Sequence, residues 1–461
     1  MERLANFTEI RDQIFKELLK NKWQNSLDKE KLNLITEKII SKYNLKEKDI
    51  PYIKNHIRVA MGLNPLKNNF FNGDIEVGVI EKPVVTKIDG ICEECEKEDM
   101  IPCKYDALIY NKNRNTEIEK ENCMGCGECI AKCDYGAFAD KIEFIPLIDM
   151  LKNDNIPVFA SVAPSIAGQF GEQVSTGKLR SIFKYLGFED MVEVALFADI
   201  LTIREAYEFD HLVRKEEDFF LTSCCCPIWV KMVEKNYPQI FSHMSMAVSP
   251  MIASGRFLKK LYPESRVVFV APCTAKKVEA KDPVLKGAID FVITFSELKN
   301  VISALDLEAA DFDNDEKDQA SFAGRVYGRT GGVSLSVKSV VNRIAPHRLI
   351  NLKAKKIHGI KNCKDILSDL AAGKNIGANF IEGMACIGGC VGGPETNIDR
   401  EQATKILNKQ GEESLIMTPM DNLNIIKILQ ELGLSDYDDI VMDEEIKNML
   451  IREVREPMKI K

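Results

Sequence analysis

Apolar residues recur along this chain with two different spacings. Near the start, in a lysine-rich segment, Ile10, Ile14 and Leu18 follow one another every four residues, a pattern that predicts amphipathic helices. Between residues 146 and 420, short continuous apolar runs alternate with longer helical patterns. The clearest runs, which we expect to form buried strands, are 157–162, 266–270 and 291–294. Strands separated by helices indicate parallel α/β units.

These patterns divide the chain into four segments. We expect a helical N-terminal region over 1–84, a small cysteine-rich domain over 85–145, a larger α/β domain with mostly parallel sheets over 146–420, and helices over 421–461.

Composition narrows the class of protein. The 14 cysteines among 461 residues cluster at short spacings, which indicates metal ligation in a reducing compartment rather than a disulfide framework. A net charge of −8 disfavours nucleic acid as the main partner. The N-terminus lacks the apolar segment of a secretory signal, and no uncharged apolar run reaches about 18 residues. We therefore expect a cytoplasmic protein that does not enter a membrane.

A compact cysteine motif predicts a [4Fe–4S] cluster. Its spacing, x2, x2 and x3, lets three thiolates surround one cluster while the fourth reaches another. A zinc site is the alternative, but this spacing departs from the usual zinc pairs. Asp134 replaces the proline that commonly follows the fourth cysteine. The four residues are Cys123, Cys126, Cys129 and Cys133.

A second, looser motif lies upstream at Cys92, Cys95 and Cys103. The tails 103–108 and 133–138 are similar, and both resemble the end of a ferredoxin half-motif, which predicts a ferredoxin-like α+β domain with two [4Fe–4S] clusters. In the register that we favour, Cys103 joins Cys123, Cys126 and Cys129, while Cys92, Cys95 and Cys133 hold the other cluster. Its fourth position is then vacant or taken by Glu96, Glu98 or Asp99. In the alternative register, Cys103 is a delayed third ligand and the defect moves to the other cluster.

Three further cysteine motifs lie far apart in the larger domain. Residues 222–229 contain three consecutive cysteines, residues 271–279 contain Cys273, and residues 382–390 contain Cys386 and Cys390 among glycines. No short loop gathers these thiols. A fold that brings them together would build a thiolate-lined pocket suited to an iron–sulfur cofactor.

The three motifs together resemble those of the [FeFe]-hydrogenase catalytic domain, over roughly residues 150–400. Three features depart from most relatives and indicate a divergent subgroup: the third cysteine of the first motif, Ala271 in the second, and residues 391–394 in the third. The resemblance implies a two-lobed catalytic domain and reversible reduction of protons to H2. It also implies an H-cluster, in which a [4Fe–4S] cubane joins a two-iron unit with CO, cyanide and azadithiolate.

The resemblance also implies residue roles. Cys225 would pass protons to the cofactor, although a shifted register would place the proton cysteine at 224 and the ligand at 225. The implied cubane ligands are Cys226, Cys273, Cys386 and Cys390, of which Cys390 would bridge to the two-iron unit. Implied contacts to the two-iron unit come from Lys276, Pro164, Ser165, Met384 and Gly332.

A proton relay is implied as well. Glu205 and Glu208 are three residues apart, which places both on one side of a helix. Ser245 and Glu279 occupy positions that resemble the family relay. The order that we expect is surface, Glu205, Ser245, Glu208, water and Cys225.

Three further residues have structural interpretations: Cys363 as a structural thiol, His243 as a structural histidine and Trp229 as a core residue. The expected partners are a soluble electron carrier such as ferredoxin, protons and H2, and maturation proteins. Two alternative functions remain, an H2 sensor and a non-catalytic iron–sulfur assembly protein of the same fold. The presence of Lys276, Met384 and the paired glutamates disfavours a pure scaffold.

Overall fold

The chain folds into two compact units. The computed structural model describes residues 7–72, 80–88, 101–110, 116–133, 135–153, 155–222 and 225–452. The first unit comprises Met1–Ile156, Cys273–Lys281 and Phe291–Ala309, and the second comprises Pro157–Pro272, Asp282–Asp290 and Ala310–Lys461. The distal cysteine motif that contains Cys273 therefore belongs to the same unit as the N-terminal helices.

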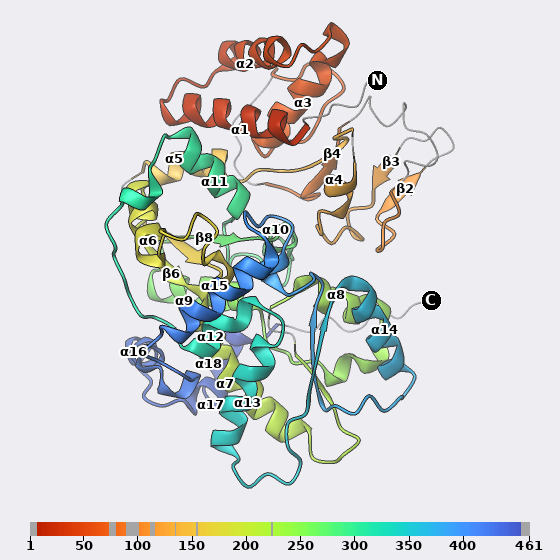
Figure 1. Cartoon of the computed structure of the whole chain (residues 1–461), viewed down its shortest axis with the longest axis vertical. Helices are drawn as coiled ribbons and strands as arrows, with labels where there is room; N and C mark the ends of the chain where they lie inside the picture. Colours follow the sequence, from red (N-terminus) through yellow and green to blue (C-terminus); the bar gives the residue numbers. More distant parts are fainter. Residues whose placement is uncertain are drawn as a thin grey trace. The chain divides into compact units, whose positions relative to one another are not determined.

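Three helices open the first unit (Figure 1): α1 (Phe7–Trp23), α2 (Lys29–Lys42) and α3 (Ile50–Ala60). Ile10, Ile14 and Leu18 are buried on one face of α1, as their spacing predicts. That helix contacts α2, α3, α5 (Phe144–Leu151) and α11 (Phe295–Ala304). The N-terminal helices therefore pack into the body of the first unit.

The cysteine-rich segment is a small α+β fold. Strand β1 (Val85–Lys87) pairs antiparallel with β4 (Phe138–Asp140), and β2 (Leu108–Tyr110) pairs antiparallel with β3 (Thr116–Ile118). Helix α4 (Glu128–Lys132) follows the compact motif. The first unit also contains α10 (Ala275–Ala280) and β9 (Phe291–Thr294).

The second unit is built on parallel strands. Strand β5 (Val158–Val162) lies between β6 (Asp190–Glu193) and β8 (Arg266–Ala271) and pairs parallel with both. All five residues of β5 are buried. The predicted strands at 157–162, 266–270 and 291–294 are confirmed as β5, β8 and β9. Helix α6 (Thr176–Tyr185) contacts β6, and α9 (Pro250–Leu261) contacts β5 and β8. Helix α7 (Val194–Leu212) contacts α9.

A second parallel sheet has the order β10–β11–β7. Its strands are β10 (Ala354–His358), β11 (Phe380–Met384) and the short β7 (Phe220–Leu221). The helices α8 (Pro227–Asn236), α13 (Gly332–Ile344) and α14 (Ile360–Ala371) contact β11. The remaining helices are α12 (Phe322–Arg325), α15 (Arg400–Glu412), α16 (Leu423–Glu431), α17 (Asp439–Met442) and α18 (Glu444–Leu450). The α/β class with mostly parallel sheets and a helical N-terminal region is thereby confirmed, while the four segment boundaries stay predictions.

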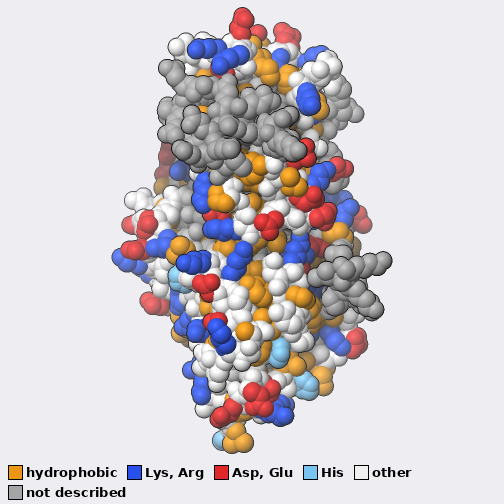
Figure 2. Space-filling view, turned by 90° about the vertical axis from the view of Figure 1, so that its right-hand side faces the viewer, with side chains coloured by type: hydrophobic (Ala, Val, Ile, Leu, Met, Phe, Trp, Pro, Cys, Tyr) orange, Lys and Arg blue, Asp and Glu red, His pale blue; other side chains and the backbone are white. Residues whose placement is uncertain are grey.

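The surface mixes both charges. On the face drawn in Figure 2, basic and acidic side chains of the described residues are interspersed. Among the described residues, no helix combines the length and the apolar character that crossing a membrane requires.

Candidate functional site

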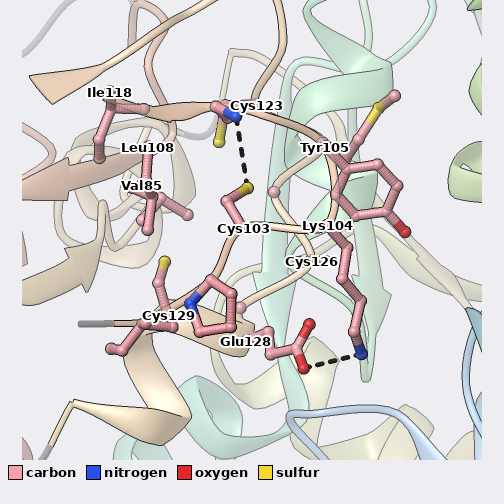
Figure 3. Close-up of a pocket in the computed structure, with 16 residues that line it drawn as sticks. Val85, Cys103, Lys104, Tyr105, Leu108, Ile118, Cys123, Cys126, Glu128 and Cys129 are labelled. Carbon is pink, nitrogen blue, oxygen red and sulfur yellow. Dashed lines mark hydrogen bonds and ion pairs between the residues drawn. The ribbon is translucent and has the colours of Figure 1, made fainter. Parts of the chain in front are cut away.

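Four cysteines surround one pocket in the first unit (Figure 3). Apolar side chains that include Val85, Leu108 and Ile118 complete its wall. The grouping agrees with the favoured register, in which one cluster takes its ligands from both motifs. The four residues are Cys103, Cys123, Cys126 and Cys129. No three His, Cys, Asp or Glu side chains in the described part of the chain are close enough to hold a single metal ion.

The two half-motif tails form the same turn. The Ala107 N–H donates to Cys103 Sγ at 3.4 Å, and the Ala137 N–H donates to Cys133 Sγ at 3.3 Å. The residue before each alanine has positive φ, 54° at Asp106 and 65° in the second tail. Backbone N–H groups directed at sulfur stabilise a thiolate, so both tails suit cluster ligation.

Burial makes these thiols costly to ionise without a metal. It raises the pKa of Cys126 to about 11 and also raises that of Cys123. Burial and then the neighbouring thiolates raise the pKa of Cys129 further. Cluster iron would stabilise the thiolates that this crowding disfavours, so the donor set fits an iron–sulfur cluster. Cys92, Cys95 and the candidate fourth ligands Glu96, Glu98 and Asp99 lie outside the described residues.

The second unit brings together the distal cysteine motif that contains Cys226 and the one that contains Cys386 and Cys390. Cys226 precedes α8, and its Sγ accepts a hydrogen bond from the Ala385 N–H at 3.4 Å. Ala385 immediately precedes Cys386, and Cys390 follows after a glycine turn. Cys225 is half-buried, whereas Cys224 lies outside the described residues.

The glycine turn before Cys390 is tightly packed. A Cβ on Gly389 would lie 2.7 Å from the Thr330 nitrogen and 2.8 Å from the Met384 sulfur, and the φ of Gly389 is 96°. The Thr330 N–H also donates to the Gly388 carbonyl at 2.8 Å. Glycine is therefore required at position 389, both for its conformation and for the close approach.

In the described part of the chain, two buried hydroxyls have no hydrogen-bond partner, one on Thr330 beside this turn and one on Ser165 beside Gly328. Among the described residues, Ser165 Oγ and Thr330 Oγ1 are buried and form no hydrogen bond. Ser165 is 1% exposed and follows Pro164, and its nitrogen would lie 3.2 Å from a Cβ on Gly328. Unsatisfied buried hydroxyls are costly. Hydrogen-bond acceptors on a cofactor, such as cyanide ligands, would satisfy them, so these residues fit the implied cofactor.

Glu382 holds the neighbouring glycine turn, a role that sequence analysis missed. Its carboxylate accepts hydrogen bonds from the Gly331 N–H at 2.6 Å and from the Ser334 N–H at 2.8 Å. A Cβ on Gly332 would collide with the Val326 carbonyl oxygen. Burial raises the pKa of Glu382.

The distal cysteine motif that contains Cys273 belongs to the first unit. Cys273 precedes α10, and in that helix Lys276 forms an ion pair with Glu279, with Nζ and Oε2 2.7 Å apart. Both side chains are buried. The Thr274 hydroxyl donates to the carbonyl of Gly125 at 2.5 Å, so the compact cluster motif contacts the start of α10.

Lys277 is the centre of a buried network of charges in the first unit. Its Nζ donates to Asp140 Oδ2 at 2.8 Å, Glu297 Oε1 at 2.5 Å and the Lys141 carbonyl at 2.8 Å. Arg11 of α1 also pairs with Asp140. Burial opposes ionisation, but Arg11 and Lys277 hold the pKa of Asp140 well below its usual range. The network links the N-terminal helices to the helix that carries Lys276.

Three of the predicted relay residues lie in two hydrogen-bonded pairs in the second unit. Ser245 Oγ donates to Glu208 Oε2 at 2.6 Å, and Arg204 Nη2 lies 2.9 Å from Glu208 Oε1. Thr222 Oγ1 lies 2.7 Å and 3.0 Å from the two carboxylate oxygens of Glu205. Sequence analysis missed Thr222 because only the fold places it beside α7.

The predicted order of this relay is wrong. Glu205 is fully buried, whereas the Glu208 side chain is 18% exposed, so Glu208 is the outer carboxyl and Glu205 the inner one. Helical spacing placed both on one face of α7 but could not show which end faces solvent. Glu279 belongs to the first unit, where it accepts a hydrogen bond from Lys276.

The three structural interpretations agree with the coordinates. Cys363 is fully buried and its Sγ donates to the Met384 carbonyl at 3.4 Å. His243 stacks on Phe219 with ring centroids 3.9 Å apart. Trp229 is 1% exposed, and its indole N–H donates to the Thr222 carbonyl.

Comparison with known families shows which family the chain belongs to. Residues 156–394 match the model of the iron only hydrogenase large subunit, C-terminal domain, which is more than half of the chain. The chain belongs to this family. The predicted resemblance to [FeFe]-hydrogenases is therefore confirmed.

Iron-only hydrogenases and assembly factors both occur among the relatives. Iron hydrogenase 1 of Clostridium pasteurianum is 28% identical over 414 residues, which cover 70% of this chain and 72% of that protein. A probable cytosolic Fe-S cluster assembly factor of Drosophila mojavensis is 23% identical over 404 residues, covering 74% and 83%. A variant of [FeFe]-hydrogenase HydA1 from Chlamydomonas reinhardtii has a similar solved structure, with a TM-score of 0.54 and 20% identity over 66% of this chain and 97% of that one. At that identity the structural likeness shows the shared fold alone.

Proposed function

We propose that this member of the iron-only hydrogenase family catalyses the reversible reduction of two protons by two electrons to H2. The observation that supports the proposal is the set of buried side chains near the glycine turn before Cys390. There, Thr330 and the sulfur of Met384 border the glycine turn, and Ser165 packs against nearby Gly328. The hydroxyls of Thr330 and Ser165 are both buried without a partner among the described residues. A scaffold that binds only a cubane has no use for further buried donors beside it.

The H-cluster would supply the metal site at which protons and electrons combine. Its cubane would be held by Cys226, Cys273, Cys386 and Cys390. Lys276 would donate a hydrogen bond to one cyanide, with Glu279 as its counter-ion, and Ser165 would donate to another. Glu208, Ser245 and Glu205 would conduct protons inward to Cys225.

Electrons would enter through the first unit. The four-cysteine pocket would hold a [4Fe–4S] cluster, and a second cluster would use Cys92, Cys95 and Cys133. The Thr274–Gly125 hydrogen bond joins the pocket motif to the residue after Cys273, which supports a route between them. A soluble carrier such as ferredoxin would deliver the electrons, and maturation proteins would install the two-iron unit.

Iron–sulfur assembly is the second candidate function, because the assembly factors match as much of this chain as the hydrogenases do. The relay distinguishes the two, since an assembly protein does not need buried paired carboxylates. An H2 sensor would share the catalytic pocket and differ in signalling.

Infrared spectroscopy tests the proposal. Protein matured anaerobically with the two-iron unit should show CO and cyanide bands and produce H2 from reduced methyl viologen. Bands without turnover would favour a sensor. Absence of the bands, together with an intact cubane by electron paramagnetic resonance, would overturn the proposal and favour the assembly function.

A further inference from the structure

Thr222 is placed to act in proton transfer, although its residue type gives no hint of this. It is 3% exposed, and its hydroxyl donates to the fully buried carboxylate of Glu205, at 2.7 Å and 3.0 Å from the two oxygens. The Trp229 indole N–H donates to the Thr222 carbonyl at 2.9 Å. The backbone of Thr222 is therefore fixed where its hydroxyl meets the inner carboxyl.

The same short strand pairing places Thr222 beside Ser245. Leu221 and Met244 form a parallel bridge, and the Ser245 N–H donates to the Leu221 carbonyl at 2.8 Å. In parallel strands, residues at matching positions direct their side chains to the same face. Thr222 follows Leu221 just as Ser245 follows Met244.

Both hydroxyls contact one helix. Ser245 donates to Glu208 at 2.6 Å and Thr222 donates to Glu205, and these carboxyls are one turn apart on α7. The outer pair is partly exposed and the inner pair is buried. From the solvent side inward, the four oxygen-bearing side chains are therefore Glu208 of α7, Ser245 and Thr222 of the paired segments, and Glu205 of α7.

From this arrangement we infer that Thr222 is a relay residue that passes protons between Ser245 and Glu205. The inference rests on the proposed function and deepens it. A proton on Glu208 moves to the Ser245 oxygen while the Ser245 proton moves to Thr222 and the Thr222 proton to Glu205. Each hydroxyl gains one proton and loses one, so the net change is one proton from Glu208 to Glu205.

Three variants of the matured protein test the inference. Thr222→Val removes the hydroxyl and keeps the shape, and Thr222→Ser restores the hydroxyl. Thr202→Val is the matched control, because Thr202, a residue of α7, is buried as Thr222 is. Its hydroxyl forms hydrogen bonds with the Ala198 carbonyl and with Ser336. Thr202 contacts neither relay pair through these bonds.

With reduced methyl viologen as donor, Thr222→Val should lower kcat on the order of 100-fold and increase the solvent isotope effect, with KM unchanged. Thr222→Ser should keep most of the turnover, and Thr202→Val should lower Tm without lowering kcat. Turnover in Thr222→Val within about twofold of Thr222→Ser would overturn the inference.

A second readout does not require hydrogenase activity. In protein that lacks the two-iron unit, the infrared band of the Glu205 carboxyl can be assigned by its loss in Glu205→Gln. The band should shift in Thr222→Val and stay in place in Thr222→Ser and Thr202→Val. An unshifted band in Thr222→Val would refute the inference, whereas a shifted band with no H2 production by the wild type would refute the proposed function alone.

Discussion

Replacing Lys277 with methionine should destabilise the first unit strongly. The Lys277 ammonium is fully buried and donates to Asp140, Glu297 and the Lys141 carbonyl, all at 2.5–2.8 Å. Removing one partner of a buried ion pair typically costs about 3–5 kcal/mol, because the remaining charge is buried without compensation. Arg11 would still pair with Asp140, so most of the cost should arise at Glu297. At roughly 2–4 °C per kcal/mol for a unit of this size, Tm should fall by about 10 °C.

Differential scanning calorimetry of Lys277→Met against the wild type measures this shift. Lys20→Met is the matched control, because Lys20 lies on exposed α1 surface, 3.7 Å from Asp306. It should change stability by less than about 0.5 kcal/mol. Adding Glu297→Gln to Lys277→Met should recover part of the loss, since it removes a carboxyl group that must otherwise be buried as an unpaired charge or take up a proton. A Tm for Lys277→Met equal to that of Lys20→Met would refute the reasoning.

Two further predictions concern the same unit. Burial, opposed by Lys277, raises the pKa of Glu297 from 4.5 to about 7. The folded protein therefore binds a proton that the unfolded chain lacks between these values. Stability should fall as pH rises from 4.5 to about 7, on the order of 3 kcal/mol, and a Tm-against-pH scan of Glu297→Gln should lose that slope. For the cluster register, Cys103→Ser and Cys126→Ser should remove the same electron paramagnetic resonance signal and Cys133→Ser the other one; a Cys103→Ser spectrum that matches Cys133→Ser would support the alternative register.

Three buried strands could be predicted from sequence because they are continuous apolar runs. Strands β5, β8 and β9 are almost entirely buried, so nearly every residue is apolar. The strands of the second sheet were harder to recognise in the sequence. Strand β10 contains Lys355 and Lys356 and is mostly exposed, and β7 has only two residues. Edge strands and very short strands do not need the composition that makes a buried strand recognisable.

The candidate site was predictable where chemistry depends on spacing and not where it depends on tertiary contacts. Cysteine spacing pointed to the four-residue pocket, since cluster ligation constrains residues close in sequence. The Thr222–Glu205 contact joins residues on different elements, and nothing in either segment indicates it. Lys277 is a similar case: it is fully buried beside the 7% exposed Lys276, although adjacent lysines normally indicate a solvated surface.

The membership of α10 in the first unit bears on how the protein could be shortened. Starting the chain at residue 146 would retain every distal cysteine and look, by motif alone, like a complete catalytic fragment. It would also delete Arg11 and Asp140, so Lys277 would lose one of its two carboxylate partners. Helix α11 would lose its contact with α1. The amino-terminal third and the motif that contains Cys273 therefore belong to one folded unit. Truncation or domain exchange in this chain should keep them together.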